Sequence, residues 1–216
     1  MFPTGAYTAE RAAALSGVPQ STLHWWARHN ILVPGVSAER TKLWSYTDLF
    51  ALRVIYWLRQ RKTDSLGSEI PRTSMPAVRR ALAQLRKLSL PVSSLLIDSK
   101  GQLHVKGPAG VQTAEGQLVR DDVLDLIAPF ATREGSRGPD LVRPRPRLLI
   151  VPGKLGGSPH VEHTRIETRA LAALRDDGLT LESIRELYPY LMDAQITDAL
   201  ELEDQLAKNL AYPTAA

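Results

Sequence analysis

The hydrophobic positions in the first 62 residues follow a helical period and predict three short helices. The first covers residues 7–18, with Thr8 as a candidate N-cap and Gly17 just after the last turn, where a left-handed backbone is favoured. The second covers residues 21–30. The third covers residues 47–62 and places four apolar side chains at core spacing: Leu49, Leu52, Ile55 and Leu58. Because a tight turn at Gly17 joins the first two, the pattern predicts a helix-turn-helix.

The second predicted helix, STLHWWARHN, has two different faces. Leu23 and Trp26 lie on the apolar face. The other face offers hydrogen-bond donors at positions i, i+3, i+4 and i+7, namely Ser21, His24, Trp25 and Arg28. Such a strip suits the recognition of DNA. From these residues alone, an ordinary amphipathic surface helix with a tryptophan at its edge is the alternative.

The stretch between the second and third helices predicts an extended wing. Pro34 and Gly35 end the second helix, and the cationic segment after them carries Arg40, Lys42 and Trp44, which we expect to hold phosphate. Helix-turn-helix, wing and supporting helix would form a small DNA-binding module, with the second helix in the major groove.

The rest of the chain is less regular. Prolines confine one helix to about residues 77–88, residues 94–108 alternate around a glycine turn as a hairpin, and residues 117–130 indicate a strand or a short helix. Near the end, three helices are predicted over residues 166–175, 181–187 and 194–210.

We therefore expect a mainly helical α+β protein. Its parts are a winged helix-turn-helix head (residues 1–62), a β-containing middle unit (63–130), an exposed linker rich in Gly, Pro and Arg (131–147) and a C-terminal three-helix domain (148–216). The linker ends in Arg-Pro-Arg-Pro-Arg, which we interpret as a stiff solvated spacer, with insertion into a minor groove as the alternative.

The two ends of the chain carry opposite charge. Residues 1–62 hold eight Lys or Arg and three acidic residues, a net charge of +5. Residues 148–216 hold six Lys or Arg and eleven acidic residues, a net charge of −5. A basic segment suits phosphates and an acidic segment does not, so the head is expected to bind DNA and the C-terminal domain to bind a protein. Solvated charged faces are the alternative.

Several function classes are disfavoured. The chain has no cysteine, and although His160 and His163 flank Glu162, no further ligand stands at metal-binding spacing. GKLGGS is not a phosphate loop, and no serine has a nucleophile setting. We expect no enzyme activity, metal or cofactor. The absence of a 20-residue apolar run and of a signal-peptide pattern predicts a cytoplasmic protein.

The head resembles the winged-helix head of MerR-type transcription regulators. The family pattern T-L-R-Y-Y-E corresponds to residues 22–27, and Y-R-x-Y to residues 41–44, with His24 and Lys42 in place of arginines. The resemblance implies that Trp25 lies against the DNA backbone and that Trp26 packs into the hydrophobic core behind the helix. Together with the donor-rich face and the wing it gives these candidate DNA-binding residues: Gln20, Ser21, Thr22, His24, Trp25, Arg28, Arg40, Lys42 and Trp44.

The C-terminal part resembles domain of unknown function 433, whose pattern contains G-G-x-P, T-R-I, D-G and Y-P-x-L. The residues that match this pattern are Gly156, Gly157, Pro159, Thr164, Arg165, Ile166, Gly178, Tyr188, Pro189 and Leu191. His163 stands where the pattern has a glycine. The combination with a MerR-type head resembles VapB-type antitoxins, whose gene partners encode PIN-like ribonucleases.

That resemblance implies an antitoxin that neutralises a ribonuclease toxin and represses its own promoter. We also expect a homodimer, because one short recognition helix covers too few base pairs for useful specificity. The acidic face of the last helix gives the candidate toxin-binding residues Asp198, Glu201, Leu202 and Asp204. Two alternatives stay open: a one-component regulator whose middle unit binds a small molecule, and a C-terminal domain that serves only for oligomerisation.

Overall fold

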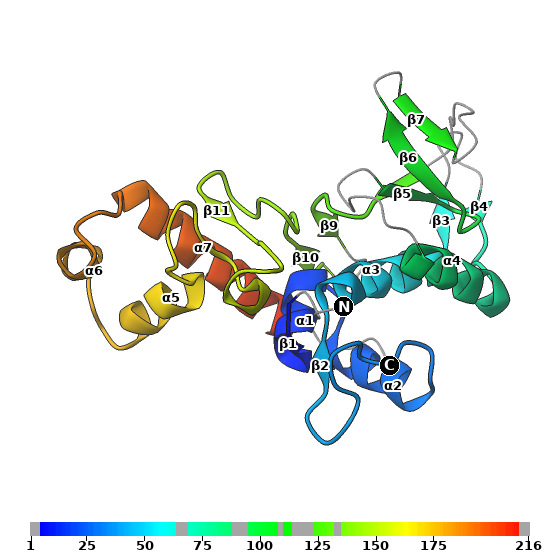
Figure 1. The fold of residues 1–216 in the computed structure, drawn as a ribbon, viewed down its shortest axis with the longest axis horizontal. Coiled ribbons are helices and arrows are strands. Elements are labelled where there is room, and N and C mark those ends of the chain that lie inside the picture. The colour runs from blue at the N-terminus through cyan, green and yellow to red at the C-terminus, as the bar shows by residue number, and fades with distance from the viewer. Residues whose placement is uncertain are drawn as a thin grey trace. The chain divides into compact units, whose positions relative to one another are not determined.

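A computed structural model describes residues 5–63, 69–87, 95–107, 110–113, 123–131 and 135–211 (Figure 1). The chain forms two compact units, one made of Met1–Tyr46 with Pro129–Ala216 and the other of Thr47–Ala128. The described residues contain seven α-helices and several small antiparallel sheets. The expectation of a mainly helical α+β protein with an N-terminal helix-turn-helix is therefore confirmed.

The N-terminal part of the first unit is the helix-turn-helix. Strand β1 (Tyr7–Thr8) leads into α1 (Ala9–Ser16), and α2 (Gln20–Arg28) follows after a short turn. The caps are those the sequence predicts: the Thr8 side chain accepts a hydrogen bond from the Arg11 N–H, and Gly17 has φ +77°. Strand β2 (Leu43–Trp44) closes the wing by pairing antiparallel with β1, Tyr7 opposite Trp44.

The C-terminal part of the first unit holds the three predicted helices, α5 (Thr168–Asp176), α6 (Leu181–Leu187) and α7 (Asp193–Ala211). Thr180 caps α6 by accepting a hydrogen bond from the Ser183 N–H. His163 has φ +62°, so it occupies the left-handed turn in which the family pattern has a glycine. Short antiparallel pairs precede the helices: β9 (Phe130–Ala131) with β10 (Arg137–Gly138), and β11 (Leu148–Leu149) with β12 (His160–Val161).

Residues 135–147 are not the exposed linker that their composition predicts. Ser136 and Leu141 are buried, and the Ser136 hydroxyl donates to the carbonyl of Gly17. The turn glycine itself lies against this segment, since a Cβ on Gly17 would come within 2.9 Å of the Gly138 nitrogen. The segment is therefore part of the compact unit, held by contacts with the head that no local pattern reveals.

The second unit contains most of α3 (Tyr46–Arg59), followed by β3 (Lys62–Thr63), β4 (Glu69–Ile70) and α4 (Met75–Lys87). A four-stranded antiparallel sheet has the order β7-β6-β5-β8, formed by Gly110–Thr113, Leu103–Gly107, Leu95–Asp98 and Val123–Asp125. The predicted hairpin is β5-β6, and the segment that indicated a strand or a helix supplies the strand β8. Arg53 is fully buried and donates to the carbonyls of Leu126, Ile127 and Ala128.

Candidate nucleic-acid interface

Helix α2 separates its side chains into a buried and an exposed face. Leu23 is fully buried and Trp26 is only 7% exposed, so both anchor the helix, as the 3.6-residue period predicts. Trp25 is 46% exposed and Arg28 is also exposed. The remaining candidates on α2 are exposed or half-buried: Gln20, Ser21, Thr22 and His24. The structure thus brings the predicted donor strip together on one helix surface.

Two contacts within α2 restrict the exposed side chains. The rings of Trp25 and His29 stack with centroids 4.2 Å apart, and His29 Nδ1 lies 2.8 Å from the carbonyl oxygen of Trp25. The Arg28 guanidinium donates to the carbonyl of His24. Sequence reasoning missed His29, although its i+4 spacing from Trp25 was a usable signal. The stack restricts the orientation of the exposed indole.

The wing presents two cations beside this helix. Ser37 and Leu43 exchange backbone hydrogen bonds and so close a loop of residues 38–42. Arg40 is exposed and Lys42 is half-buried. Neither has an ion-pair partner within the described part of the chain. Both are therefore available to an external anion such as a phosphate.

Trp44 does not belong to this surface, so its prediction as a phosphate contact is wrong. Its side chain is fully buried in β2, and its indole N–H has no hydrogen-bond partner among the described residues. Alternation along a strand explains the difference, because neighbouring residues point to opposite faces and the wing buries the face that carries Trp44.

Several other cations are occupied inside the protein. Arg11 pairs with Glu203, and the three arginines of the Arg-Pro-Arg-Pro-Arg segment bind carboxylate or amide oxygens: Arg143 binds Glu162, Arg145 binds Gln205 and Arg147 binds Asp198. The Arg143 contact also lowers the pKa of the Glu162 carboxyl. These arginines tie the segment to the C-terminal domain, which contradicts both the solvated-spacer and the minor-groove interpretations. On α2 and the wing, Arg28, Arg40 and Lys42 have no acidic partner among the described residues.

The predicted toxin-binding residues do not form one free surface. Leu202 is fully buried and is a core residue, so its assignment as a contact residue is wrong. Asp198 is only 13% exposed at its side chain and accepts hydrogen bonds from Arg147, which makes it an internal partner instead. Asp204 is half-exposed and pairs with Arg175, whereas Glu201 is exposed. The helix α7 packs against α5 and α1, and the two acids on its inner side, Asp198 and Glu203, are paired with arginines of other segments.

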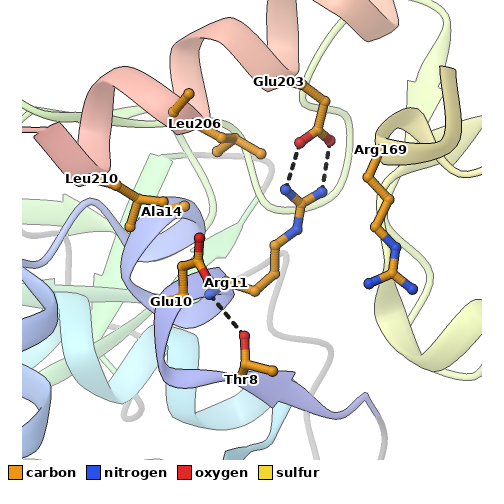
Figure 2. Close-up of a pocket in the computed structure, with 9 residues that line it drawn as sticks. Thr8, Glu10, Arg11, Ala14, Arg169, Glu203, Leu206 and Leu210 are labelled. Atoms are coloured by element: carbon orange, nitrogen blue, oxygen red, sulfur yellow. Dashed lines mark hydrogen bonds and ion pairs between the residues drawn. The ribbon is translucent and has the colours of Figure 1, made fainter. Parts of the chain in front are cut away.

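The contact between α1 and α7 joins the head to the C-terminal domain. The Arg11 guanidinium donates two hydrogen bonds of 2.7 Å to the Glu203 carboxylate (Figure 2). The same carboxylate also accepts a hydrogen bond from the Thr168 hydroxyl. The pair borders a cavity of about 290 Å³ whose apolar wall includes Ala14, Leu206 and Leu210. Figure 2 shows Arg169 on the opposite side of this cavity from Arg11.

A second link joins Tyr7 to the glycine pair of the C-terminal pattern. The Tyr7 hydroxyl donates to the carbonyl of Gly157 at 2.8 Å, and the Ala6 N–H donates to the carbonyl of Gly156. Burial raises the pKa of the Tyr7 phenol far above its usual value. Gly157 has φ +83°, and a Cβ there would lie 2.1 Å from the Tyr7 oxygen. The position therefore requires glycine for backbone conformation and for space.

The histidines near β12 do not form a metal site with Glu162. His160 is fully buried and His163 is 90% exposed at its side chain, so the two imidazoles lie in different environments. In the described part of the chain, no group of three or more His, Asp or Glu side chains is placed to hold a metal ion. None of the helices described there is both long and apolar enough to cross a membrane.

Two family models match parts of the chain. The model described as MerR HTH family regulatory protein matches residues 7–64. The chain contains a MerR-type helix-turn-helix domain. A second model, described as Protein of unknown function (DUF433), matches residues 150–202. Both resemblances are thereby confirmed at the level of the domain, and a MerR-type domain indicates a DNA-binding regulator.

Comparison with whole proteins adds little. No curated protein matches the chain. Among solved structures, the X-ray crystal structure of Rv2018 from Mycobacterium tuberculosis matches at 16% sequence identity and a TM-score of 0.47, covering 93% of this chain and 98% of that one. A similarity of this size carries no information about activity or partners.

Proposed function

We propose that the protein is a DNA-binding antitoxin that represses its own promoter. The observation that carries the DNA-binding part is the surface formed by α2 and the wing, where Trp25, Arg28, Arg40 and Lys42 are accessible and have no acidic partner among the described residues. A helix offering donors to base edges, beside cations that hold phosphate, is the geometry of winged helix-turn-helix proteins.

The antitoxin part rests on the VapB-type resemblance and on the acidic C-terminal domain. A PIN-like ribonuclease binds RNA through a basic cleft, which an acidic protein surface can occupy. We propose that the protein acts as a two-fold dimer, because one short recognition helix covers too few base pairs for useful specificity. Its operator would then be a palindrome with half-sites about one helical turn apart.

The test of this proposal is a pair of binding experiments with the full-length protein. Mobility shifts on the DNA upstream of its own gene should show binding that Arg28→Ala weakens, by about 1–3 kcal/mol if Arg28 contacts a base. The ribonuclease encoded beside the gene should co-purify with the protein and lose its activity. If the protein binds DNA but does not inhibit the nuclease, it is a DNA-binding regulator and the proposed antitoxin role is wrong.

The cavity between α1 and α7 favours a second candidate, a one-component regulator. Small-molecule sites occur preferentially between domains and combine apolar walls with a few charged groups, as here with Ala14, Leu206 and Arg11. In this alternative the effector would bind there rather than in the middle unit. Thermal-shift screening that finds a small ligand, together with a ligand-dependent change in DNA affinity, would support it over the antitoxin.

A further inference from the structure

The most exposed hydrophobic side chains lie together at the turn between α6 and α7. Nine large hydrophobic side chains are exposed in the described part of the chain, and the three most exposed are Leu187 at 57%, Met192 at 58% and Tyr190 at 66%. We call these three residues the tip patch. Single exposed hydrophobics are ordinary on protein surfaces, but three within six residues indicate a contact surface.

The backbone around the tip patch is fixed by local contacts. Leu191, between two patch residues, is buried, and its N–H donates to the carbonyl of Tyr188. The Met192 N–H donates to the side-chain carbonyl of Gln195, whose own N–H donates back to Met192. The ring of Tyr188 meets that of Tyr190 edge to face at 6.3 Å. A turn whose backbone is already fixed loses little conformational entropy on binding, which favours its exposed side chains as anchors.

The charge around the tip patch selects the kind of partner. Residues 176–207 include nine acidic residues and one cation, Arg185. Five of these acids are paired, Asp193 with Arg185 and the other four with Arg11, Arg147 or Arg175 of neighbouring segments. The exposed acids without an ion-pair partner among the described residues include Glu182 and Glu186 on α6, next to the patch. A basic surface with an apolar recess complements this arrangement. A second copy would bring two acidic surfaces together, and DNA would bring its own negative charge.

We infer that the tip patch is the surface through which the C-terminal domain binds a basic protein, and that this protein is the ribonuclease of the proposed function. The inference rests on that proposed function and moves the contact from the acidic face of α7 to the α6–α7 turn. The patch and the α1 contact lie at opposite ends of α7 (Figure 1). The nuclease would then engage the C-terminal domain without covering α2.

The experiment compares two double variants of the full-length protein. The patch variant is Leu187→Ser with Tyr190→Ser, and its control is Val142→Ser with Val151→Ser, which changes two exposed valines of the same unit. Each is titrated by calorimetry with the purified ribonuclease encoded by the adjacent gene. Thermal unfolding and mobility shifts on the promoter DNA are measured in parallel, so that a folding defect is recognised.

We expect the patch variant to lose at least about thirtyfold in affinity for the nuclease, the effect of removing central anchors, while the control variant and all DNA binding stay within about twofold of wild type. Unchanged nuclease binding by the patch variant would overturn the inference and leave the proposed function intact. If wild type itself does not bind the nuclease, the proposed function fails. If light scattering shows that only the patch variant loses a wild-type dimer, the patch is an interface between copies and the inference is wrong.

Discussion

Arg11 and Glu203 lie 192 residues apart in the sequence and face each other through two N–H···O hydrogen bonds of 2.7 Å. Their side chains are 19% and 13% exposed. A bidentate ion pair that is this well buried stabilises the fold more than a surface ion pair does, because fewer water molecules compete for either group. The pair therefore joins the first helix of the DNA-binding head to the last helix of the chain.

We predict that this pair is strongly coupled. Arg11→Met and Glu203→Gln should each lower the free energy of unfolding by about 2–3 kcal/mol, since each leaves a poorly solvated charge without its partner. The double variant should lose clearly less than the sum of the two. Denaturant unfolding of the wild type, the two single variants and the double variant measures this coupling energy. Strictly additive losses would show that the interaction between the two side chains contributes nothing to stability.

Lys42 should act through phosphate rather than through bases. Lys42→Ala should weaken binding to promoter and unrelated DNA alike, and should reduce the slope of log affinity against log salt by about one unit. Lys154→Ala is the control, because Lys154 carries the same charge in the C-terminal domain. Equal slopes for the two variants, measured by fluorescence anisotropy at several salt concentrations, would exclude a phosphate contact by the wing.

Gly157 should tolerate no side chain. Gly157→Ala forces a left-handed alanine against the Tyr7 oxygen and should destabilise the protein by about 2–4 kcal/mol. Adding Tyr7→Phe removes that oxygen and should recover part of the loss, even though Tyr7→Phe alone costs about 1 kcal/mol. Gly153→Ala is the matched control, since nothing lies within 4 Å of its added Cβ. Thermal unfolding distinguishes the four variants, and an unaltered Gly157→Ala protein would contradict the packing.

The buried Arg53 should be essential for the second unit. Arg53→Met removes the donor shared by the carbonyls of Leu126, Ile127 and Ala128, and should lower stability by about 2–4 kcal/mol. Arg79→Met removes an exposed arginine from α4 and should change stability by less than about 0.5 kcal/mol. Similar losses for both variants in urea unfolding would show that Arg53 has no special role.

Stability should fall in mild acid because of His160. Burial is the main cause that lowers the pKa of this imidazole below 6.5, so the folded state binds a proton less readily than the unfolded state. The free energy of unfolding should be level above about pH 7. It should decrease as the pH drops through 6.5, and level off again below the folded-state pKa.

His160→Gln should remove this component of the pH dependence, and the exposed His163→Asn should retain it. The variants can be compared by the difference in melting temperature between pH 7.5 and pH 5. If both variants follow the wild-type profile, the acid sensitivity comes from other groups.

Local sequence signals predicted the helices well. The Thr8 cap and Gly17 after α1 are short-range features, and the structure has each of them at the predicted position. The exposed face of α2 also followed from the 3.6-residue period, because it needs only the helix and a core on one side.

What the sequence could not predict depends on distant partners. Trp44 and Trp25 are both aromatic residues in cationic stretches, yet one is fully buried and the other is exposed. Residues 143–147 have the composition of a spacer, but their arginines meet acceptors supplied by residues up to 60 positions away. Asp198 appeared to be a surface acid for the same reason, since its partner Arg147 lies on another segment.

Asn209 gives the order of synthesis a consequence for the folding of the helix-turn-helix. Its carboxamide donates to the carbonyls of Ala14 and Arg137 and accepts the Arg137 N–H, so the third-last residue of α7 completes the end of α1. The ribosome has to synthesise residues 1–208 before it adds this residue. A chain released before residue 209 therefore lacks the group that ties the end of α1 to Arg137, and its helix-turn-helix should be less stable than that of the intact protein.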